Sequence, residues 1–405
     1  DHMQADGISP NVVTYTCSLK ACGDIGATYK GQEIHFELKR QGLDNDIAIG
    51  SALVGMYIKC GQLKKAREIF DRFPIRNTIT WNALISGYVT HEHSEEALKC
   101  FEKMREEGIA PNPSTFVFSL KAAGCTKDTQ KIQEIHADIE RKGFLEGDLV
   151  VGNTLVDMYA KCGSIKEAQN VFDILPDRNI VSWGAMITGY AHLDYGSVAL
   201  QLFREMQKNN IKPNRVIYLS VLKACANVGV IDQGEAIHNQ ILASGLDLEL
   251  PIISSLIDMY VKCNAVVEAR EVLDAMKTRD IVSWNSLLVG YCEVGLTGEA
   301  LEFLEWMQSQ GTCPDHITYT CCIRACGGRG SITNGQHLHT DVIKKGFEQD
   351  DIVSSTLVDM YAKCGALEES HYLFVQLSVH DTISCNSMMV GCVEQGHYQA
   401  ALNLL

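Results

Sequence analysis

Leu-Val-Asp-Met-Tyr-Ala-Lys-Cys-Gly, at residues 155–163, contains a hexapeptide that recurs along the chain at a fixed spacing. Met-Tyr-x-Lys-Cys-Gly, with Asn264 replacing the last Gly in one copy, is found at 56–61, 158–163, 259–264 and 360–365. The copies begin 102, 101 and 101 residues apart. This constant spacing predicts a tandem array and replaces the two or three globular domains that 405 residues would otherwise suggest.

Each long period divides into three shorter repeats with signatures of their own. One kind begins near Trp81, Trp183 or Trp284, a second carries Leu-Lys-Ala as at 222–224, and a third holds the Met-Tyr hexapeptide. Counting between equivalent residues gives repeats at 12–46, 47–77, 78–112, 113–148, 149–179, 180–214, 215–249, 250–280, 281–315, 316–350 and 351–381. Residues 1–11 end one repeat and residues 382–405 begin another, so we expect a fragment of a longer protein.

Each repeat is expected to form two helices, as the repeat 149–179 illustrates. Its first apolar segment runs to Lys161, and Gly163 then ends the helix because glycine readily takes the left-handed conformation. Ser164 and Glu167 match a capping box for a second helix with apolar residues at helical spacing. Proline closes the 35-residue repeats, where a helix must stop, at Pro111, Pro213 and Pro314. We predict an all-α fold, a right-handed superhelical α-solenoid of tandem helix-turn-helix repeats with a long concave surface.

The composition suits a soluble folded chain without membrane spans. Hydrophobic residues make up 46% and charged residues 21%, and no apolar run reaches the roughly 18 residues of a span. Eight of the 16 cysteines recur by repeat: Cys60, Cys162, Cys263 and Cys364 share one position, and Cys22, Cys225 and Cys326 share another, which slips to Cys125 in one copy. Cysteine at a fixed helical position predicts a small buried hydrophobe. Reduced thiols indicate an intracellular compartment.

The net charge of −15 argues against simple nucleic-acid binding, since phosphate contacts require cations. Two repeated positions on first helices are nevertheless basic: Lys59, Lys161, Lys262 and Lys363, and Lys20, Lys121, Lys223 and Arg324. The first set is expected to contact phosphate only weakly. Two interpretations stay open, a basic stripe that binds RNA within an acidic shell and ordinary solvated lysine.

The repeat lengths and signatures resemble the pentatricopeptide repeats of the plant PLS class, the type found in organellar RNA editing factors. Val-Ser-Trp-Asn-Ser-Leu-Leu (282–288), Leu-Lys-Ala-Cys (222–225) and the nonapeptide 155–163 carry the resemblance, which covers essentially the whole chain. In this class the variants alternate, and the labels L, S and P apply in that order from repeat 12–46 onward. The two incomplete end repeats are then P-type. The resemblance implies binding of single-stranded RNA at about one base per repeat, read by a few side chains.

In the family the fifth and last residues of a repeat face the base edge, while an aliphatic second residue sandwiches the ring. When this family rule is applied to the present chain, the pairs are expected to read these bases: Ser51/Asn77 reads A, Asn82/Asn112 and Asn153/Asn179 read a pyrimidine, Ser254/Asp280 and Ser355/Asp381 read G, and Asn285/Asp315 reads U. Gly184 with Asn214 departs from the pattern, and Asn386 would add a pyrimidine but lacks its partner. From repeat 47–77 to repeat 351–381 the implied RNA is A-Y-n-Y-n-n-G-U-n-G, 5′ to 3′, with Y a pyrimidine.

L-type repeats follow this pairing rule poorly in the family. Thr16/Asp46 and Thr320/Asp350 favour G, whereas Val117 and Leu219 cannot hydrogen-bond a base. L-type repeats with apolar residues there would serve partner docking, which resembles binding to the multiple organellar RNA editing factor proteins. For every pair the alternative is an ordinary polar helix start, because Ser and Asn are common N-caps.

Two further repeated residue types are assigned to packing. The tryptophans beside the fifth residue are expected between helices, with stacking on RNA as the alternative. The histidines His35, His136, His238 and His339 recur on second helices and are expected to pack or hydrogen-bond. His35-Phe36-Glu37 matches half of a zinc-deaminase signature, but no Pro-Cys-x-x-Cys follows. We therefore expect no enzyme activity, metal or cofactor.

The sequence thus predicts a chain that binds RNA without catalysing a reaction. By resemblance it selects sites for C-to-U editing of chloroplast or mitochondrial transcripts, with the deaminase outside this chain, and no targeting peptide is visible. One alternative is RNA binding for splicing, cleavage or stabilisation. Another is a protein-interaction solenoid without an RNA role, which the acidity favours. Neither a membrane nor a small-molecule substrate is expected as a partner.

Overall fold

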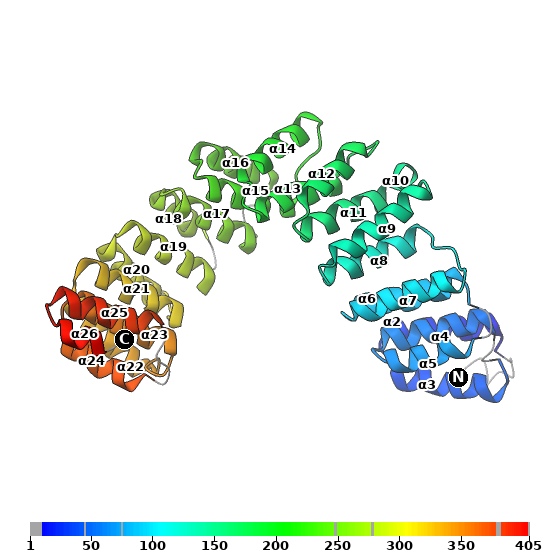
Figure 1. Cartoon of the computed structure of the whole chain (residues 1–405), viewed down its shortest axis with the longest axis horizontal. Coiled ribbons are helices and arrows are strands. Elements are labelled where there is room, and N and C mark those ends of the chain that lie inside the picture. Colours follow the sequence, from blue (N-terminus) through cyan, green and yellow to red (C-terminus); the bar gives the residue numbers. More distant parts are fainter. Residues whose placement is uncertain are drawn as a thin grey trace. The chain divides into compact units, whose positions relative to one another are not determined.

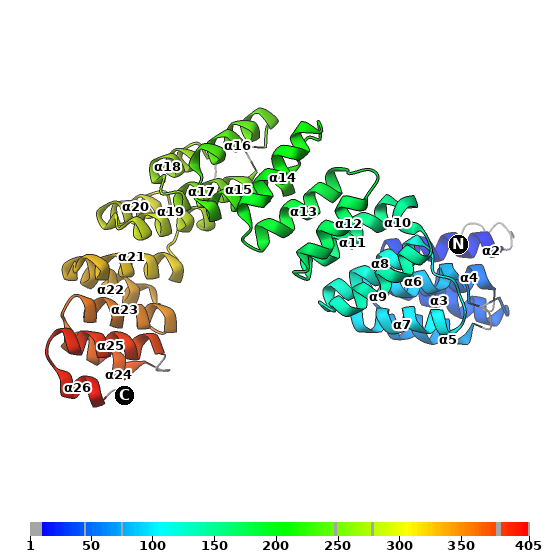
Figure 2. The same ribbon diagram turned by 45° about the horizontal axis from the view of Figure 1, so that its top comes forward.

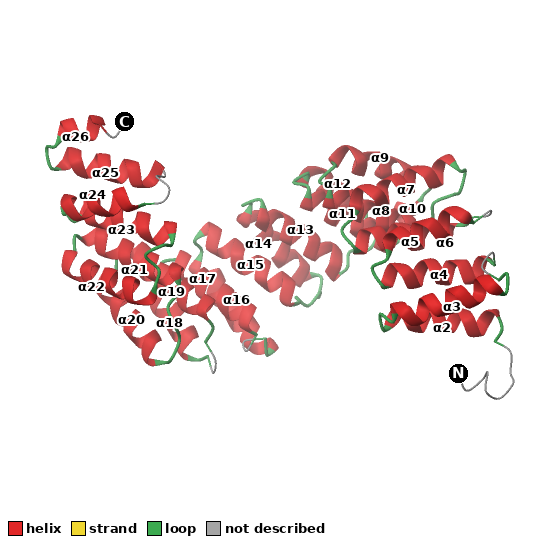
Figure 3. Ribbon diagram, turned by 90° about the horizontal axis from the view of Figure 1, so that it is seen from below, coloured by secondary structure: helices red, strands yellow, loops and turns green. Residues whose placement is uncertain are grey.

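The computed structural model describes residues 10–43, 46–73, 76–246, 249–276, 279–377 and 382–403. Regular structure within those ranges is helical, as Figure 3 shows in red, which confirms the predicted all-α class. The incomplete repeat at the start of the chain falls almost wholly outside the described residues, and so does Asp381. The chain forms two compact halves, residues 1–212 and 213–405, each described by itself below.

In the N-terminal half the helices follow one another in pairs, a first and a second helix per repeat (Figure 1). The first helices are α2 (Val12–Asp24), α4 (Ile47–Lys59), α6 (Thr78–Thr90), α8 (Pro113–Cys125), α11 (Leu149–Lys161) and α13 (Ile180–His192). The second helices are α3 (Thr28–Arg40), α5 (Leu63–Arg72), α7 (Ser94–Glu106), α9 (Thr129–Arg141), α12 (Ile165–Ile174) and α14 (Gly196–Lys208). A single helical turn, α10 (Phe144–Gly147), was not predicted.

The C-terminal half repeats the same alternation. Its first helices are α15 (Arg215–Val228), α17 (Leu250–Lys262), α19 (Ile281–Val294), α21 (His316–Arg329), α23 (Asp351–Lys363) and α25 (Thr382–Glu394). Its second helices are α16 (Ile231–Ser244), α18 (Val266–Asp274), α20 (Thr297–Ser309), α22 (Ile332–Lys345), α24 (Leu367–Gln376) and α26 (Tyr398–Asn403).

Within each half the first helices form one layer and the second helices another. Consecutive first helices contact each other, and Figure 2 shows α21, α23 and α25 side by side. Each second helix contacts the first helix of its own repeat and, where one follows in the same half, the first helix of the next repeat. A repeat therefore buries its apolar faces largely against its neighbours, which is the α-solenoid arrangement.

The repeated tryptophans lie in the core of this two-layer stack. Trp81 and Trp284 are fully buried and Trp183 is nearly so. Phe70, on the second helix of the preceding repeat, meets Trp81 edge-on with 4.6 Å between ring centroids. Phe172 meets Trp183 in the same way at 5.0 Å, and such pairs add about 0.5–1.5 kcal/mol beyond the area they bury. The packing interpretation is confirmed, so these buried rings do not present a stacking platform.

The ends of the helices confirm one local prediction and correct another. Gly163 takes a left-handed φ of 79°, and Asn264 takes the equivalent φ of 65°. Ser164, in contrast, makes no side-chain capping hydrogen bond to α12, so the predicted capping box with Glu167 is wrong. Ser164 follows the left-handed residue directly and has ψ of 60°, whereas capping hydroxyls normally extend from a β-region backbone.

The repeated histidines make contacts between neighbouring repeats. Each histidine Nδ1 lies 2.9–3.2 Å from a tyrosine hydroxyl of the next first helix, in the pairs His35–Tyr57, His136–Tyr159, His238–Tyr260 and His339–Tyr361. Burial lowers the pKa of His136 and of His339. Hydrogen bonding by these histidines is therefore confirmed.

The cysteine prediction needs correction in part. Cys22, Cys225 and Cys326 are buried, but Cys125 is exposed and the Cys60 set is only half-buried. Members of the Cys60 set follow the last residue of a first helix, and each thiol lies 3.8–4.0 Å from a backbone carbonyl oxygen of the preceding first helix. Every cysteine of the described residues is a free thiol. In those same ranges, no helix is both long and apolar enough to cross a membrane.

Candidate nucleic-acid interface

The last residue of a repeat is the N-cap of the next first helix. Its side chain accepts backbone N–H groups of the first helical turn at Asn11, Asp46, Asn77, Asn112, Asp148, Asn179, Asn214, Asp280, Asp315 and Asp350. Glu249 occupies the same place without a capping bond from its side chain. The N-cap interpretation is therefore correct for the last residues. A cap uses only part of the side chain, however, so it leaves room for a second role.

In two P-type repeats the fifth residue is hydrogen-bonded directly to that cap. Asn82 Nδ2 donates to Asn112 Oδ1 at 3.0 Å. Asn285 Nδ2 lies 3.0 and 3.1 Å from the two carboxylate oxygens of Asp315. A threonine hydroxyl from the first turn of the following helix donates to the side-chain Oδ1 of each fifth residue, at 2.6 Å for Asn82 and 2.7 Å for Asn285. These pairs lie together at the N-terminal ends of adjacent first helices.

Two S-type repeats form related pairs. Asn153 Nδ2 donates to Asn179 Oδ1 at 3.2 Å, while its own Oδ1 is buried and has no partner. Ser254 reaches Asp280 indirectly, because its hydroxyl lies 3.2 Å from that of Ser283, which donates to Asp280 at 2.5 Å. The structure therefore brings together four of the predicted pairs.

The other predicted fifth residues satisfy their hydroxyls within their own helix. Each donates to the backbone carbonyl three or four residues earlier: Thr16 to Val12, Ser51 to Ile47, Thr320 to His316 and Ser355 to Ile352. Asp381, the partner of Ser355, lies outside the described residues. Asn386 is exposed on α25.

The residues that depart from the expected pairing of fifth and last residues also lie on or beside first helices. Gly184 lies in α13 and brings no side chain. Asn214 caps α15. Val117 and Leu219, the apolar fifth residues of L-type repeats, are half-buried in α8 and α15.

An exposed aliphatic side chain recurs at the second position of most repeats, beside these pairs. In the N-terminal half the residues are Val13, Ile79, Val150 and Val181, and in the C-terminal half Val216, Val282, Ile317 and Ile352. Their exposed fractions run from 44% to 70%. Scattered exposed aliphatics are ordinary, but a recurring set at one helical position indicates a binding surface. The sequence contained this signal in the recurrence of Val or Ile at the second position.

Asp315 contributes a negative charge to the polar pair that it forms with Asn285. Burial raises the pKa of Asp315, but hydrogen bonds from the Thr318 backbone, the Thr318 hydroxyl and Asn285 lower it more in sum. The pKa of Asp315 therefore lies below its ordinary value, and the side chain is a carboxylate at neutral pH.

The repeated lysines already have acidic partners. Lys161, Lys262 and Lys363 each pair with the aspartate one turn earlier, at 2.7, 2.9 and 2.7 Å. Lys59 pairs with Asp24 of the neighbouring first helix. These lysines stand about 12 Å along the helix from the fifth residue, at about 1.5 Å per residue. Lys20, Lys121, Lys223 and Arg324 are exposed.

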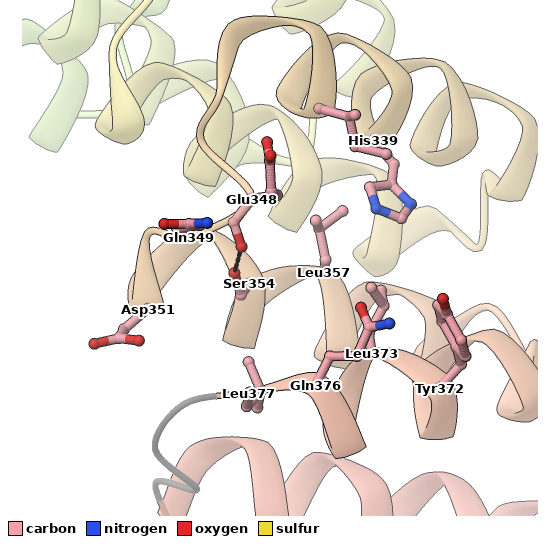
Figure 4. A pocket seen from close by; sticks show the side chains of 11 residues that line it. His339, Glu348, Gln349, Asp351, Ser354, Leu357, Tyr372, Leu373, Gln376 and Leu377 are labelled. Atoms are coloured by element: carbon pink, nitrogen blue, oxygen red, sulfur yellow. Dashed lines mark hydrogen bonds between the residues drawn. The ribbon is translucent and has the colours of Figure 1, made fainter.

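A separate pocket of about 830 Å³ lies in the C-terminal half among α22, α23 and α24 (Figure 4). Leu357, Leu373 and Leu377 line it together with Tyr372 and His339. Ser354 donates to the backbone carbonyl of Glu348 at its edge, at 2.8 Å. None of the predicted base-reading residues lines this pocket.

Two stacked layers of paired helices, with polar pairs and aliphatic side chains at the capped ends of one layer, define an α-solenoid helical-repeat protein. Two family models match this chain. One, described as "PPR repeat family", matches residues 76–123, 178–227 and 279–328. The other, described as "PPR repeat", matches 51–77, 153–180 and 253–281. The chain belongs to the pentatricopeptide repeat family.

Relatives in Arabidopsis thaliana extend the match to the whole chain. One chloroplastic pentatricopeptide repeat-containing protein is 34% identical over 402 residues, covering 99% of this chain and 50% of the relative. A second chloroplastic member is 33% identical over 398 residues, covering 98% and 46%. The chain spans about half the length of these curated relatives.

Solved structures match the fold. The pentatricopeptide repeat protein PPR10 in complex with an 18-nt psaJ RNA element superposes with a TM-score of 0.73 at 19% identity, over all of this chain and 64% of that one. PPR10 from maize gives 0.60 at 20% identity, with the same coverage.

Proposed function

We propose that this chain binds single-stranded RNA sequence-specifically, with about one base per repeat. The observation that carries the proposal is the repeated placement of an exposed aliphatic second residue beside a hydrogen-bonded pair of fifth and last residues. A flat base can lie against the aliphatic side chain while its Watson–Crick edge meets the polar pair. The RNA bound in the PPR10 complex supports RNA as the ligand.

The polar groups left over at two of the pairs, Asn285/Asp315 and Asn82/Asn112, agree with the bases that we assign. Asp315 is a carboxylate, which accepts from the N3–H of U. The Oδ1 of Asn112 accepts the capping hydrogen bond, so its amide NH₂ remains available to donate to the acceptors on a pyrimidine. From repeat 47–77 to repeat 351–381 the proposed target remains A-Y-n-Y-n-n-G-U-n-G.

We further propose the PLS class and a role in choosing C-to-U editing sites of organellar transcripts, with the deaminase outside this chain. The alternation of 35-, 31- and 35-residue repeats supports the class. The chloroplastic relatives support localisation in an organelle, and we propose either the chloroplast or the mitochondrion. L-type repeats would dock multiple organellar RNA editing factor proteins. Lys59, Lys161, Lys262 and Lys363 would contact phosphate weakly, since doing so competes with their aspartates.

A protein-interaction solenoid is the second candidate. The net charge of −15 and the pairing of the repeated lysines favour it. Its binding would depend little on salt, whereas RNA binding weakens steeply as salt rises.

A pair of matched valine variants tests the proposal. Val282→Ser removes an exposed aliphatic from the second position of α19, and Val267→Ser removes one from the second helix α18. Binding of a labelled A-Y-n-Y-n-n-G-U-n-G RNA is measured by fluorescence anisotropy at two salt concentrations. Losing a buried aliphatic contact of about 1 kcal/mol predicts roughly fivefold weaker binding for the first variant and no change for the second. Equal affinities of the two variants, or binding insensitive to salt, would contradict the proposal.

A further inference from the structure

The last residue of each complete, described S-type repeat is preceded by an arginine whose guanidinium turns back onto the previous helix. The three arginines are Arg76, Arg178 and Arg279. Each donates Nε to the backbone carbonyl six residues earlier, at 3.3, 3.1 and 3.0 Å. Each also donates Nη2 to the carbonyl five residues earlier, at 3.0, 3.1 and 3.2 Å. Three repeats in two halves of the chain thus build the same contact.

This contact closes the C-terminal end of the S-type second helix. The last carbonyls of a helix have no partner within it, and here a cation supplies two donors to them, which the helix dipole also favours. The guanidinium lies over an aromatic ring as well, 5.3 Å from the Phe70 centroid for Arg76 and 4.6 Å from Phe172 for Arg178. Arg279 lies over Trp306 at 5.1 Å. The arginine therefore fixes its own backbone against the packed core.

The next residue in the chain is the one expected to meet the base. Asn179, for example, follows Arg178, caps α13 through Val181 and Ser182, and accepts from Asn153. Its position is therefore held on both sides, by the arginine before it and by the cap after it. An arginine that acts on the last residue in this way has no need to touch the RNA.

The other repeat types differ at this position. P-type repeats carry Pro111, Pro213 and Pro314 there, and proline fixes φ near −65°. The described L-type repeats carry Gly147 and Gln349, which provide neither constraint. The hydrogen-bonded pairs above occur only in S- and P-type repeats, and the described L-type repeats form none of them. A constrained backbone is not sufficient for a pair, because Ser51 in repeat 47–77 donates to Ile47 and Gly184 in repeat 180–214 has no side chain.

We propose that Arg76, Arg178 and Arg279 are positioning residues for base discrimination by the S-type repeats. This inference rests on the proposed RNA-binding function. The arginine orients the last residue of the repeat. Loss of the arginine therefore weakens the preference for one base at a single RNA position without abolishing RNA binding. Proline performs the equivalent task in P-type repeats.

The test compares Arg178→Ala with Arg178→Lys and with Arg204→Ala, which removes an exposed charge from α14. Affinities are measured for four RNAs that carry a pyrimidine or a purine at the fourth base, and U or C at the eighth. The fourth base belongs to repeat 149–179 and the eighth to repeat 281–315. Thermal melting of each variant shows whether the fold is kept.

Arg178→Ala is expected to reduce the pyrimidine preference at the fourth base about threefold or more, as for a loss of part of one base contact. The U preference at the eighth base stays unchanged, and Arg204→Ala leaves both preferences as they were. Arg178→Lys does not restore the preference, because an ammonium group lacks the planar fork that meets two carbonyls. If Arg178→Ala unfolds the protein, Arg279→Ala is measured instead with two further RNAs that carry G or A at the seventh base, which belongs to repeat 250–280.

The outcomes separate the two proposals. If the unmodified chain shows no preference at either base, the proposed function fails. If the unmodified chain discriminates at the fourth base and Arg178→Ala discriminates equally well, the positioning role is overturned. A uniform loss of affinity with both preferences kept would also overturn it, since that result indicates a contribution of charge alone. Full rescue by Arg178→Lys would overturn the two-carbonyl geometry.

Discussion

Replacing Asp315 with asparagine isolates base recognition from helix capping. Asp315 accepts the Thr318 backbone N–H at 2.9 Å, and the Thr318 hydroxyl, whose one proton it shares with Asn285 Oδ1, lies 2.8 Å away. Asparagine retains an oxygen for these bonds, and it is about as good an N-cap as aspartate. The substitution therefore leaves the first turn of α21 closed. What changes is Oδ2, where a carboxylate acceptor becomes an amide donor. Asn285 Nδ2 loses its 3.1 Å contact there but keeps its 3.0 Å bond to Oδ1, which is the arrangement of the Asn82–Asn112 pair.

The expected magnitude follows from the single contact that changes. A U presents an N–H donor at N3, which suits the carboxylate, whereas C presents an acceptor at N3, which suits an amide N–H. A well-formed contact to a base edge discriminates by about 1–3 kcal/mol, and about 1.4 kcal/mol corresponds to tenfold in affinity. We therefore expect Asp315→Asn to shift the U-to-C affinity ratio at the eighth base about tenfold toward C.

The assay is fluorescence anisotropy with two RNAs that differ only as U or C at the eighth base. Asp148→Asn is the matched control, because the Asp148 side chain also caps a first helix, α11, but its repeat has the apolar Val117 at the fifth position. The control should leave the U-to-C preference at the eighth base unchanged. Equal weakening of both RNAs by Asp315→Asn, or a shift of the same size in the control, would refute the reasoning.

Two further predictions concern stability. Because burial lowers the pKa of His136 and His339, the unfolded chain binds more protons than the folded chain near and below the ordinary histidine pKa. The free energy of unfolding, measured in urea, should therefore be highest above that pKa and decrease as the pH is lowered from about 7.5 to about 5.5. The His339→Phe variant should show a smaller decrease over the same pH range. Gly163→Ala places a Cβ at a φ of 79° and should cost about 1–2 kcal/mol by the same measurement. Gly163→Asn should cost less, as Asn264 already tolerates that conformation, and equal costs for the two would contradict the left-handed requirement.

The sequence predicted what depends on local periodicity. The 101-residue spacing, the paired helices and the left-handed residues at Gly163 and Asn264 all follow from patterns within one repeat. The same is true of the cap residues, whose bonds reach only two or three residues along the chain. Burial of the tryptophans followed from their place in the helical period.

Contacts between repeats were harder to foresee. The partners of the repeated lysines are one turn away in three copies but on the neighbouring helix for Lys59, because Gly55 replaces the aspartate there. The arginines that close the S-type helices were visible as a repeated residue, but the carbonyls they bind are defined only once the helix end is known. Ser164 shows the opposite failure, because a capping motif in sequence does not ensure the backbone angles that a cap requires.

The most direct test of sequence-specific RNA binding uses three labelled RNAs and the unmodified chain, at two salt concentrations. One RNA carries A-Y-n-Y-n-n-G-U-n-G, one exchanges its G and U positions, and one is a scrambled control. We expect the first to bind best at both salt concentrations, with all affinities weakening as salt rises. Equal binding of the three RNAs, or no binding to any, would contradict base reading by the paired fifth and last residues.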